Sequence, residues 1–175
     1  MSNGTTVKKR NGRGTEPLNL EKMHKMVDEA TKGIAGVSAS QVEIQSGIQF
    51  YDGITTAEIQ EILIKSASDL IDLEHPNYQF VAARLLLFAI RKQIYGKIRE
   101  LPHLETHIMN CTSRDVYDKD IFTKYSKEEI EKVNGYIDHD RDYLFTYAGL
   151  RQESPTPLPK EIPLSSGLQT SMKRI

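Results

Sequence analysis

Cysteine, tryptophan and long apolar runs are scarce or absent in this chain of 175 residues. Its single cysteine, Cys111, excludes a disulfide framework, a Cys-x-x-Cys redox pair and any multi-cysteine metal site built within the chain. No apolar run approaches the roughly 20 residues that a membrane-spanning helix needs. Residues 1–14 are polar and basic where a signal peptide would have an apolar core. We therefore expect a cytoplasmic protein that does not contact membranes.

A global excess of charge is also lacking, because the formal net charge is −1. Such a balance gives no overall attraction to nucleic acid. The exception is local: the first fourteen residues carry cations, Lys9 and Arg10 among them, and no acid. Residues 11–14 tolerate positive φ angles, which predicts a basic β-hairpin formed by residues 7–10 and 15–18.

Hydrophobic periodicity predicts a mainly α (α+β) fold behind this hairpin. Capping patterns start two of the helices, at Thr55 and at Ser126. The alternation at residues 48–51 predicts a short third strand. The helix expected over residues 77–99 is apolar around most of its circumference and should lie at the centre of a bundle. The other expected helices span residues 19–33, 38–45, 55–75, about 104–110, one from 126, and 138–152.

Proline is concentrated in the last part of the chain, where four of the seven prolines fall within residues 155–163. This composition predicts an extended or disordered tail. We accordingly divide the chain into residues 1–98, a helical connection at 99–152 and a tail at 153–175.

Three helix faces mix polar and apolar chemistry at helical spacing. By spacing alone, an ordinary structural role is favoured for Phe88 and Lys92, with the ring buried and the amine reaching solvent. For the basic stretch at residues 9–14, composition alone favours a solvated hairpin or a nucleic-acid-binding arm over a nucleotide site. The three faces are Asn19 with Lys22 and Met23, Thr56 with Gln60, and Phe88 with Lys92.

Other chemistry-bearing residues give weaker signals. His103 and His107 stand four residues apart, a spacing compatible with metal binding, but such pairs are more often solvent-facing. The charged residues 138–142 are typical of a helix start. Cys111 has no activating partner near it in the sequence, so we expect it to be inert. We predict no catalytic residue and no metal site.

Several ordered motifs together closely resemble one family. They are VKKRNG at residues 7–12, LNLEK at 18–22, IQFYDGI at 48–54, YQFVAARL at 78–85, YSKEEI at 125–130 and IDHDRD at 137–142. The resemblance is to the N-terminal ATP-cone domain of the large (α) subunit of class I ribonucleoside-diphosphate reductase. It covers roughly residues 5–152.

The resemblance implies a four-helix bundle capped by a three-stranded sheet that binds ATP or dATP, accompanied by Mg²⁺, as an allosteric effector. Lys9, Arg10 and Lys92 would hold phosphates. Gln60 stands near the effector where many members carry histidine, which puts inhibition by dATP in doubt. The residues enclosing the base and sugar would be Val7, Leu18, Met23 and Phe88, with polar contacts from Glu16, Asn19, Lys22 and Thr56.

The family's reaction requires several cysteines in a ten-stranded barrel, and this chain stops before any barrel. We therefore expect a truncated or split subunit that cannot reduce ribonucleotides by itself. Our first hypothesis is an adenine-nucleotide-binding regulatory module of the reductase. The second is a fragment that binds reductase subunits, namely the remaining large-subunit polypeptide, the small radical subunit or a second copy. A nucleic-acid-binding module is the weakest of the three.

Overall fold

The structure is a computed structural model that describes residues 5–9 and 14–153. Arg10 and the predicted tail lie outside these residues. The chain forms two compact units, each described by itself below. The first contains the described residues up to Ile90 together with Tyr143–Leu150, and the second contains Arg91–Asp142 and the described residues after Leu150. The domain boundaries expected from the sequence remain predictions.

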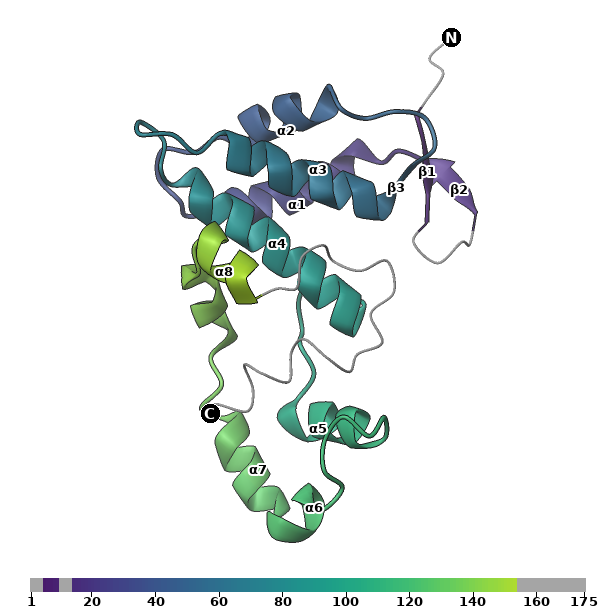
Figure 1. The fold of residues 1–175 in the computed structure, drawn as a ribbon, viewed down its shortest axis with the longest axis vertical. Helices are drawn as coiled ribbons and strands as arrows, with labels where there is room; N and C mark the ends of the chain where they lie inside the picture. The colour runs from purple at the N-terminus through teal and green to yellow at the C-terminus, as the bar shows by residue number, and fades with distance from the viewer. Residues whose placement is uncertain (1–4, 10–13, 154–175) are drawn as a thin grey trace. The chain divides into compact units, whose positions relative to one another are not determined.

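A small sheet forms one end of the first unit (Figure 1). Strand β1 (Thr6–Lys8) lies between β2 (Thr15–Pro17), to which it is antiparallel, and β3 (Ile54–Thr55), to which it is parallel. Val7 and Ile54 are buried neighbours in this sheet, with 3% and 0% of their surface exposed. The predicted hairpin is therefore confirmed in its two strands.

The predicted third strand at residues 48–51 is wrong, because β3 begins only at Ile54. The amide of Gln49 donates to the Ser46 carbonyl at 3.0 Å, so this stretch is a turn that follows a helix. The chain begins to pair with strand β1 of the hairpin only at Asp52 and Gly53. The Thr6 amide donates to Asp52 Oδ1 at 2.8 Å, and the Gly53 amide donates to the Thr6 carbonyl at 2.9 Å.

Four helices make up the bundle: α1 (Leu20–Thr31), α2 (Ala39–Gly47), α3 (Thr56–Asp69) and α4 (Tyr78–Tyr95). The first three begin at the predicted caps, and Thr55 with Glu58 forms a complete capping box. Helix α4 ends about four residues earlier than expected, because Gly96 adopts a φ of 73°, a left-handed conformation that stops a helix. A mainly helical fold with a small sheet is thus confirmed.

The bundle core is formed by aliphatic side chains that α1, α3 and α4 contribute at helical spacing. Helix α4 is buried over most of its length, as its apolar circumference predicts. The fully buried positions in these three helices include Val27, Leu63, Val81, Leu85 and Leu86.

The later elements are α5 (Leu104–Thr112), α6 (Ile121–Lys124), α7 (Lys127–Asn134), the 3₁₀ helix η1 (His139–Leu144) and α8 (Tyr147–Glu153). Helix α7 begins at the predicted Ser126 capping box. The single helix expected over residues 138–152 is wrong. Thr146 starts a new helix, because its hydroxyl accepts a hydrogen bond from the Gly149 amide at 3.2 Å.

Within the described ranges, no helix combines the length and the apolar character needed to cross a membrane.

Candidate functional site

The basic hairpin is held by an ion pair between its two strands. Lys9 Nζ lies 2.9 Å from Glu16 Oε2, with both side chains partly exposed. The hydrogen bond from Lys9 lowers the pKa of the Glu16 carboxyl from its ordinary value. Lys9 and Glu16, both predicted to contact the effector, are therefore in direct contact in this structure, and Val7 lies buried beside them.

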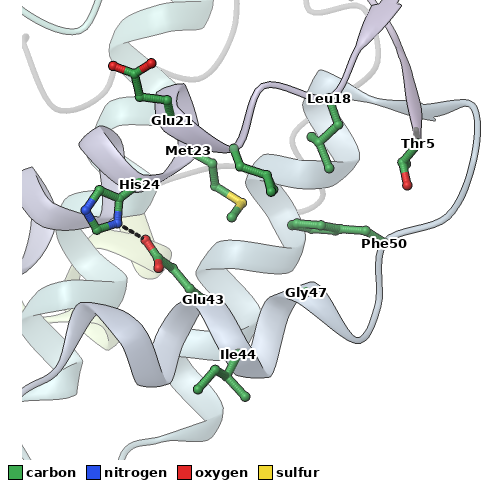
Figure 2. Close-up of a pocket in the computed structure, with 10 residues that line it drawn as sticks. Thr5, Leu18, Glu21, Met23, His24, Glu43, Ile44, Gly47 and Phe50 are labelled. Carbon is green, nitrogen blue, oxygen red and sulfur yellow. Dashed lines mark hydrogen bonds and ion pairs between the residues drawn. The ribbon is translucent and has the colours of Figure 1, made fainter. Parts of the chain in front are cut away.

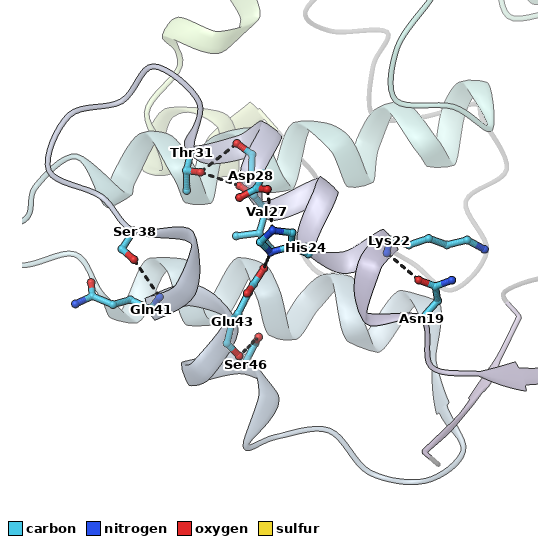
Figure 3. A network of polar contacts seen from close by, with 10 residues as sticks. All are labelled: Asn19, Lys22, His24, Val27, Asp28, Thr31, Ser38, Gln41, Glu43 and Ser46. Atoms are coloured by element: carbon cyan, nitrogen blue, oxygen red, sulfur yellow. Dashed lines mark hydrogen bonds and ion pairs between the residues drawn. The ribbon is translucent and has the colours of Figure 1, made fainter. Parts of the chain in front are cut away.

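The start of α1 presents the next group of predicted residues (Figure 3). Asn19 Oδ1 accepts a hydrogen bond from the Lys22 amide at 2.9 Å, which caps the helix. Free amides remain in the first turn of any α-helix, so this end carries a partial positive charge. The Lys22 side chain is exposed, whereas Met23 on the inner face is buried.

Helix α3 supplies Thr56 and Gln60. Thr56 is its first residue and is half-buried. Gln60 is only 4% exposed, and its side-chain amide donates to the Leu85 carbonyl of α4 at 3.0 Å. This contact shows a bridging role for Gln60 that spacing alone did not indicate.

Helix α4 supplies Phe88 and Lys92. Phe88 is 1% exposed and meets the ring of Tyr143 edge to face, with ring centroids 6.4 Å apart. Lys92, one turn further on, is exposed and falls in the second unit. The structure therefore does not place Lys92 relative to the other predicted residues.

A groove of about 690 Å³ opens between the start of α1, α2 and the turn after it. Two predicted residues, Leu18 and Met23, line it, and both point toward the ring of Phe50 (Figure 2). Most of its lining residues were not predicted, and four of the ten come from residues 43–50. The remaining lining residues are Thr5, Leu20, Glu21, His24, Glu43, Ile44 and Gly47.

A polar cluster joins α1 to α2 across this groove (Figures 2 and 3). His24 Nδ1 lies 2.7 Å from Glu43 Oε1, and His24 Nε2 lies 3.0 Å from Asp28 Oδ2. The hydrogen bond to Glu43, reinforced by the charges of both acids, raises the pKa of His24. The four-residue spacing of His24 and Asp28 could have indicated their contact, whereas nothing in the sequence points to Glu43 as a partner.

The histidines of α5 have separate structural partners. His103 caps the helix and lies 2.8 Å from Glu131, while His107 packs its ring against Tyr95 and Tyr117. His103 is exposed and His107 is half-buried, so the expectation of a solvent-facing pair holds only for His103, and burial lowers the pKa of His107. In the part of the chain that the structure describes, no group of three or more His, Cys, Asp or Glu residues could hold a metal.

Cys111 does have a neighbour, because its Sγ lies 3.6 Å from His107 Nε2. This contact is one helical turn away in the sequence, a spacing that could have revealed it. Burial nevertheless raises the pKa of the Cys111 thiol, which keeps it protonated at neutral pH.

Comparison with known proteins shows to which family the sheet and the helical bundle are similar. The ATP cone domain family matches residues 5–93. The ribonucleoside-diphosphate reductase 1 subunit alpha of Escherichia coli (strain K12) is 45% identical over 152 residues, which make up 87% of this chain and 20% of that protein. The alpha subunit of Haemophilus influenzae is 42% identical over the same shares.

The alpha subunit of Enterobacteria phage T4 is 43% identical over 119 residues, 67% of this chain and 16% of its own length. The chain thus spans about a fifth of the length of such relatives. These findings confirm the resemblance to the N-terminal region of reductase alpha subunits. Because the family match covers just over half of the chain and includes the sheet and α1 to α3, this chain belongs to the ATP-cone domain family.

Proposed function

We propose that this chain binds an adenine nucleotide, ATP or dATP, as a regulatory effector of a ribonucleoside-diphosphate reductase. The observation that carries the proposal is the match of the ATP cone domain to residues 5–93, the range that forms the sheet and the bundle. The alpha subunits to which the chain is similar support the second half of the proposal.

The phosphates bind on the hairpin side of the first unit. Lys9 gives up its ion pair with Glu16 and pairs with a phosphate of the nucleotide. The start of α1 adds backbone amides and a second cation, Lys22, in its first turn. The family resemblance assigns phosphate contacts to Arg10 and Lys92 as well, and Mg²⁺ would accompany the nucleotide. The groove between the start of α1 and α2 does not suit a polyphosphate, because the carboxylates of Glu21 and Glu43 line it and would repel the phosphates.

Base and sugar are enclosed by the apolar residues Val7, Leu18, Met23 and Phe88. Thr56, Gln60 and Asn19 provide polar contacts. Because Gln60 already donates to the Leu85 carbonyl, its free oxygen is the atom available to the effector. Gln60, unlike a histidine, does not titrate, so this contact is independent of pH.

Regulation of the reductase follows from the thermodynamic linkage between nucleotide binding and the arrangement of the subunits. A nucleotide that binds one arrangement of reductase subunits more tightly than another shifts the population toward that arrangement. The partners are then the rest of the large subunit, the small radical subunit and further copies of this chain. We assign no catalytic residue to the chain.

Thermal unfolding in the presence of ATP, dATP or GTP tests this function. A ligand at one hundred times its Kd stabilises the folded state by about 2.7 kcal/mol, which raises Tm by about 5–10 °C for a protein of this size. Lys9→Gln should reduce the ATP-induced shift, whereas Lys25→Gln, which removes an exposed lysine paired with Glu21, should leave it intact. No shift with millimolar ATP or dATP would contradict the proposal.

A second function, binding to reductase subunits, is favoured by exposed large side chains in the later elements. Tyr136 is 76% exposed, Leu144 75% and Tyr125 56%. Large side chains exposed in this way are available for contact with a partner protein. The remaining large-subunit polypeptide should co-purify with the chain, and Tyr136→Lys should weaken this association. A chain that stays monomeric in its presence would argue against the second function.

A further inference from the structure

Tyr143 joins the first unit from far along the chain. It lies in η1, outside the range that the ATP cone family matches, yet residues Tyr143–Leu150 belong to the same compact unit as the hairpin and bundle. Within that unit Tyr143 contacts Arg84 and Phe88 of α4. The predicted effector-binding unit therefore includes a returning segment that the family match does not cover.

The ring of Tyr143 is held between two residues of α4 that are one helical turn apart. Its ring meets the Phe88 ring at 6.4 Å and an interplanar angle of 85°, the favourable edge-to-face arrangement. The guanidinium carbon of Arg84 lies 5.1 Å from the centroid of the same ring. Tyr143 thus contacts both an aromatic ring and a cation of the same helix.

Arg84 is itself fixed in place. Its Nη1 donates to the Lys32 carbonyl at 2.7 Å and to the Ala30 carbonyl at 3.3 Å, at the end of α1. Its Nε is buried and has no hydrogen-bond partner among the described residues. The electron-rich face of Tyr143 compensates part of that loss, which explains why an arginine and a tyrosine are paired here.

We propose that Tyr143 is a positioning residue of the effector site: it holds the Phe88 ring in the orientation that receives the nucleotide. The inference rests on the proposed function, in which Phe88 contacts the base or sugar. Phe88 is 1% exposed and the Tyr143 ring lies nearly perpendicular to it, so loss of this contact would leave the Phe88 ring freer to reorient. Without Tyr143, nucleotide binding must also order the Phe88 side chain, which costs affinity.

The residue before Tyr143 belongs to the second unit and has its partners there. Asp142 Oδ2 accepts a hydrogen bond from Arg91 Nη2 at 2.7 Å, and the same Nη2 donates to the His139 carbonyl at 3.2 Å. Because linkage is reciprocal, a nucleotide that prefers the Phe88 orientation set by Tyr143 also stabilises the contact between these two rings.

A double-mutant cycle without nucleotide tests the contact itself. The unfolding equilibrium constant is measured by urea denaturation for Phe88→Leu, Tyr143→Leu and the double variant. We expect a coupling of about two- to tenfold in that constant, as aromatic pairs give. Additive effects of the two substitutions would show that the rings do not interact and would overturn the inference.

Calorimetric titration with ATP tests the positioning role. Tyr143→Leu should weaken ATP binding about three- to tenfold, and Tyr143→Phe, which keeps the ring, should restore it. Leu150→Ala is the matched control, since Leu150 is a buried residue of the same returning segment with no ring contact to Phe88. It should destabilise the fold but leave the ATP affinity within about twofold.

The outcomes separate this inference from the proposed function. Equal losses of affinity in Tyr143→Leu and Leu150→Ala, or binding that Tyr143→Leu leaves unchanged, would overturn the positioning role alone. Absence of ATP and dATP binding in the unsubstituted chain would overturn the proposed function and the positioning role with it.

Discussion

At the scale of single residues, His24 is the titratable group whose neighbours most clearly determine its charge. Its two ring nitrogens face Glu43 and Asp28, and this raises its pKa above the ordinary value of 6.5. A group whose pKa is raised in the folded state contributes stability that is fully present below its unfolded pKa. That contribution is lost as the pH rises through the folded pKa.

Replacing His24 with glutamine should therefore have a pH-dependent effect on stability. The loss of unfolding free energy in His24→Gln should be largest at about pH 5.5, where the histidine is charged and both acids are ionised, and should shrink toward about pH 8.5. Urea denaturation of both proteins at each pH measures it. As a control, the difference in unfolding free energy between Lys25→Gln and the original chain should stay constant over this pH range. A His24→Gln effect that grows with pH would contradict the assignment.

At the scale of elements, local signals predicted the helix starts better than the sheet. Asn19, Thr55 and Ser126 cap their helices through hydrogen bonds to residues three positions away, so the sequence pattern contains both partners. The third strand could not be located in this way. Its position depends on the pairing of Thr6 with Asp52, which lie 46 residues apart. The break at Thr146 depends on one hydroxyl within a pattern that otherwise favours a continuous helix.

The role of Asn19 as the cap of α1 can be measured separately from its proposed contact with the nucleotide. Asn19→Ala should lower the unfolding free energy by about 1 kcal/mol, because a helix amide loses its partner. Asn19→Asp keeps the cap, so its stability without nucleotide should equal that of the original chain. Its added negative charge should nevertheless weaken ATP binding. Paired denaturation and calorimetry measure the two effects, and an Asn19→Asp variant that binds ATP normally would exclude a phosphate near this cap.

At the scale of the whole molecule, the sequence predicted the fold class, but not the partners that bury the candidate site residues. Helical spacing predicted a buried Phe88 ring, which the structure confirms, but it indicated neither the Tyr143 partner of that ring nor the burial of Gln60 against Leu85, because these partners come from other elements. The groove was missed for the same reason. His24 and Glu43 meet only because α1 and α2 pack together, and they lie 19 residues apart.

The most direct test of the account is calorimetric titration of the chain with ATP. The account predicts saturable binding of ATP with dATP as a competitor, together with a loss of affinity in Lys9→Gln and a smaller loss in Tyr143→Leu. A titration that shows no saturable heat with either nucleotide at millimolar concentration would contradict it.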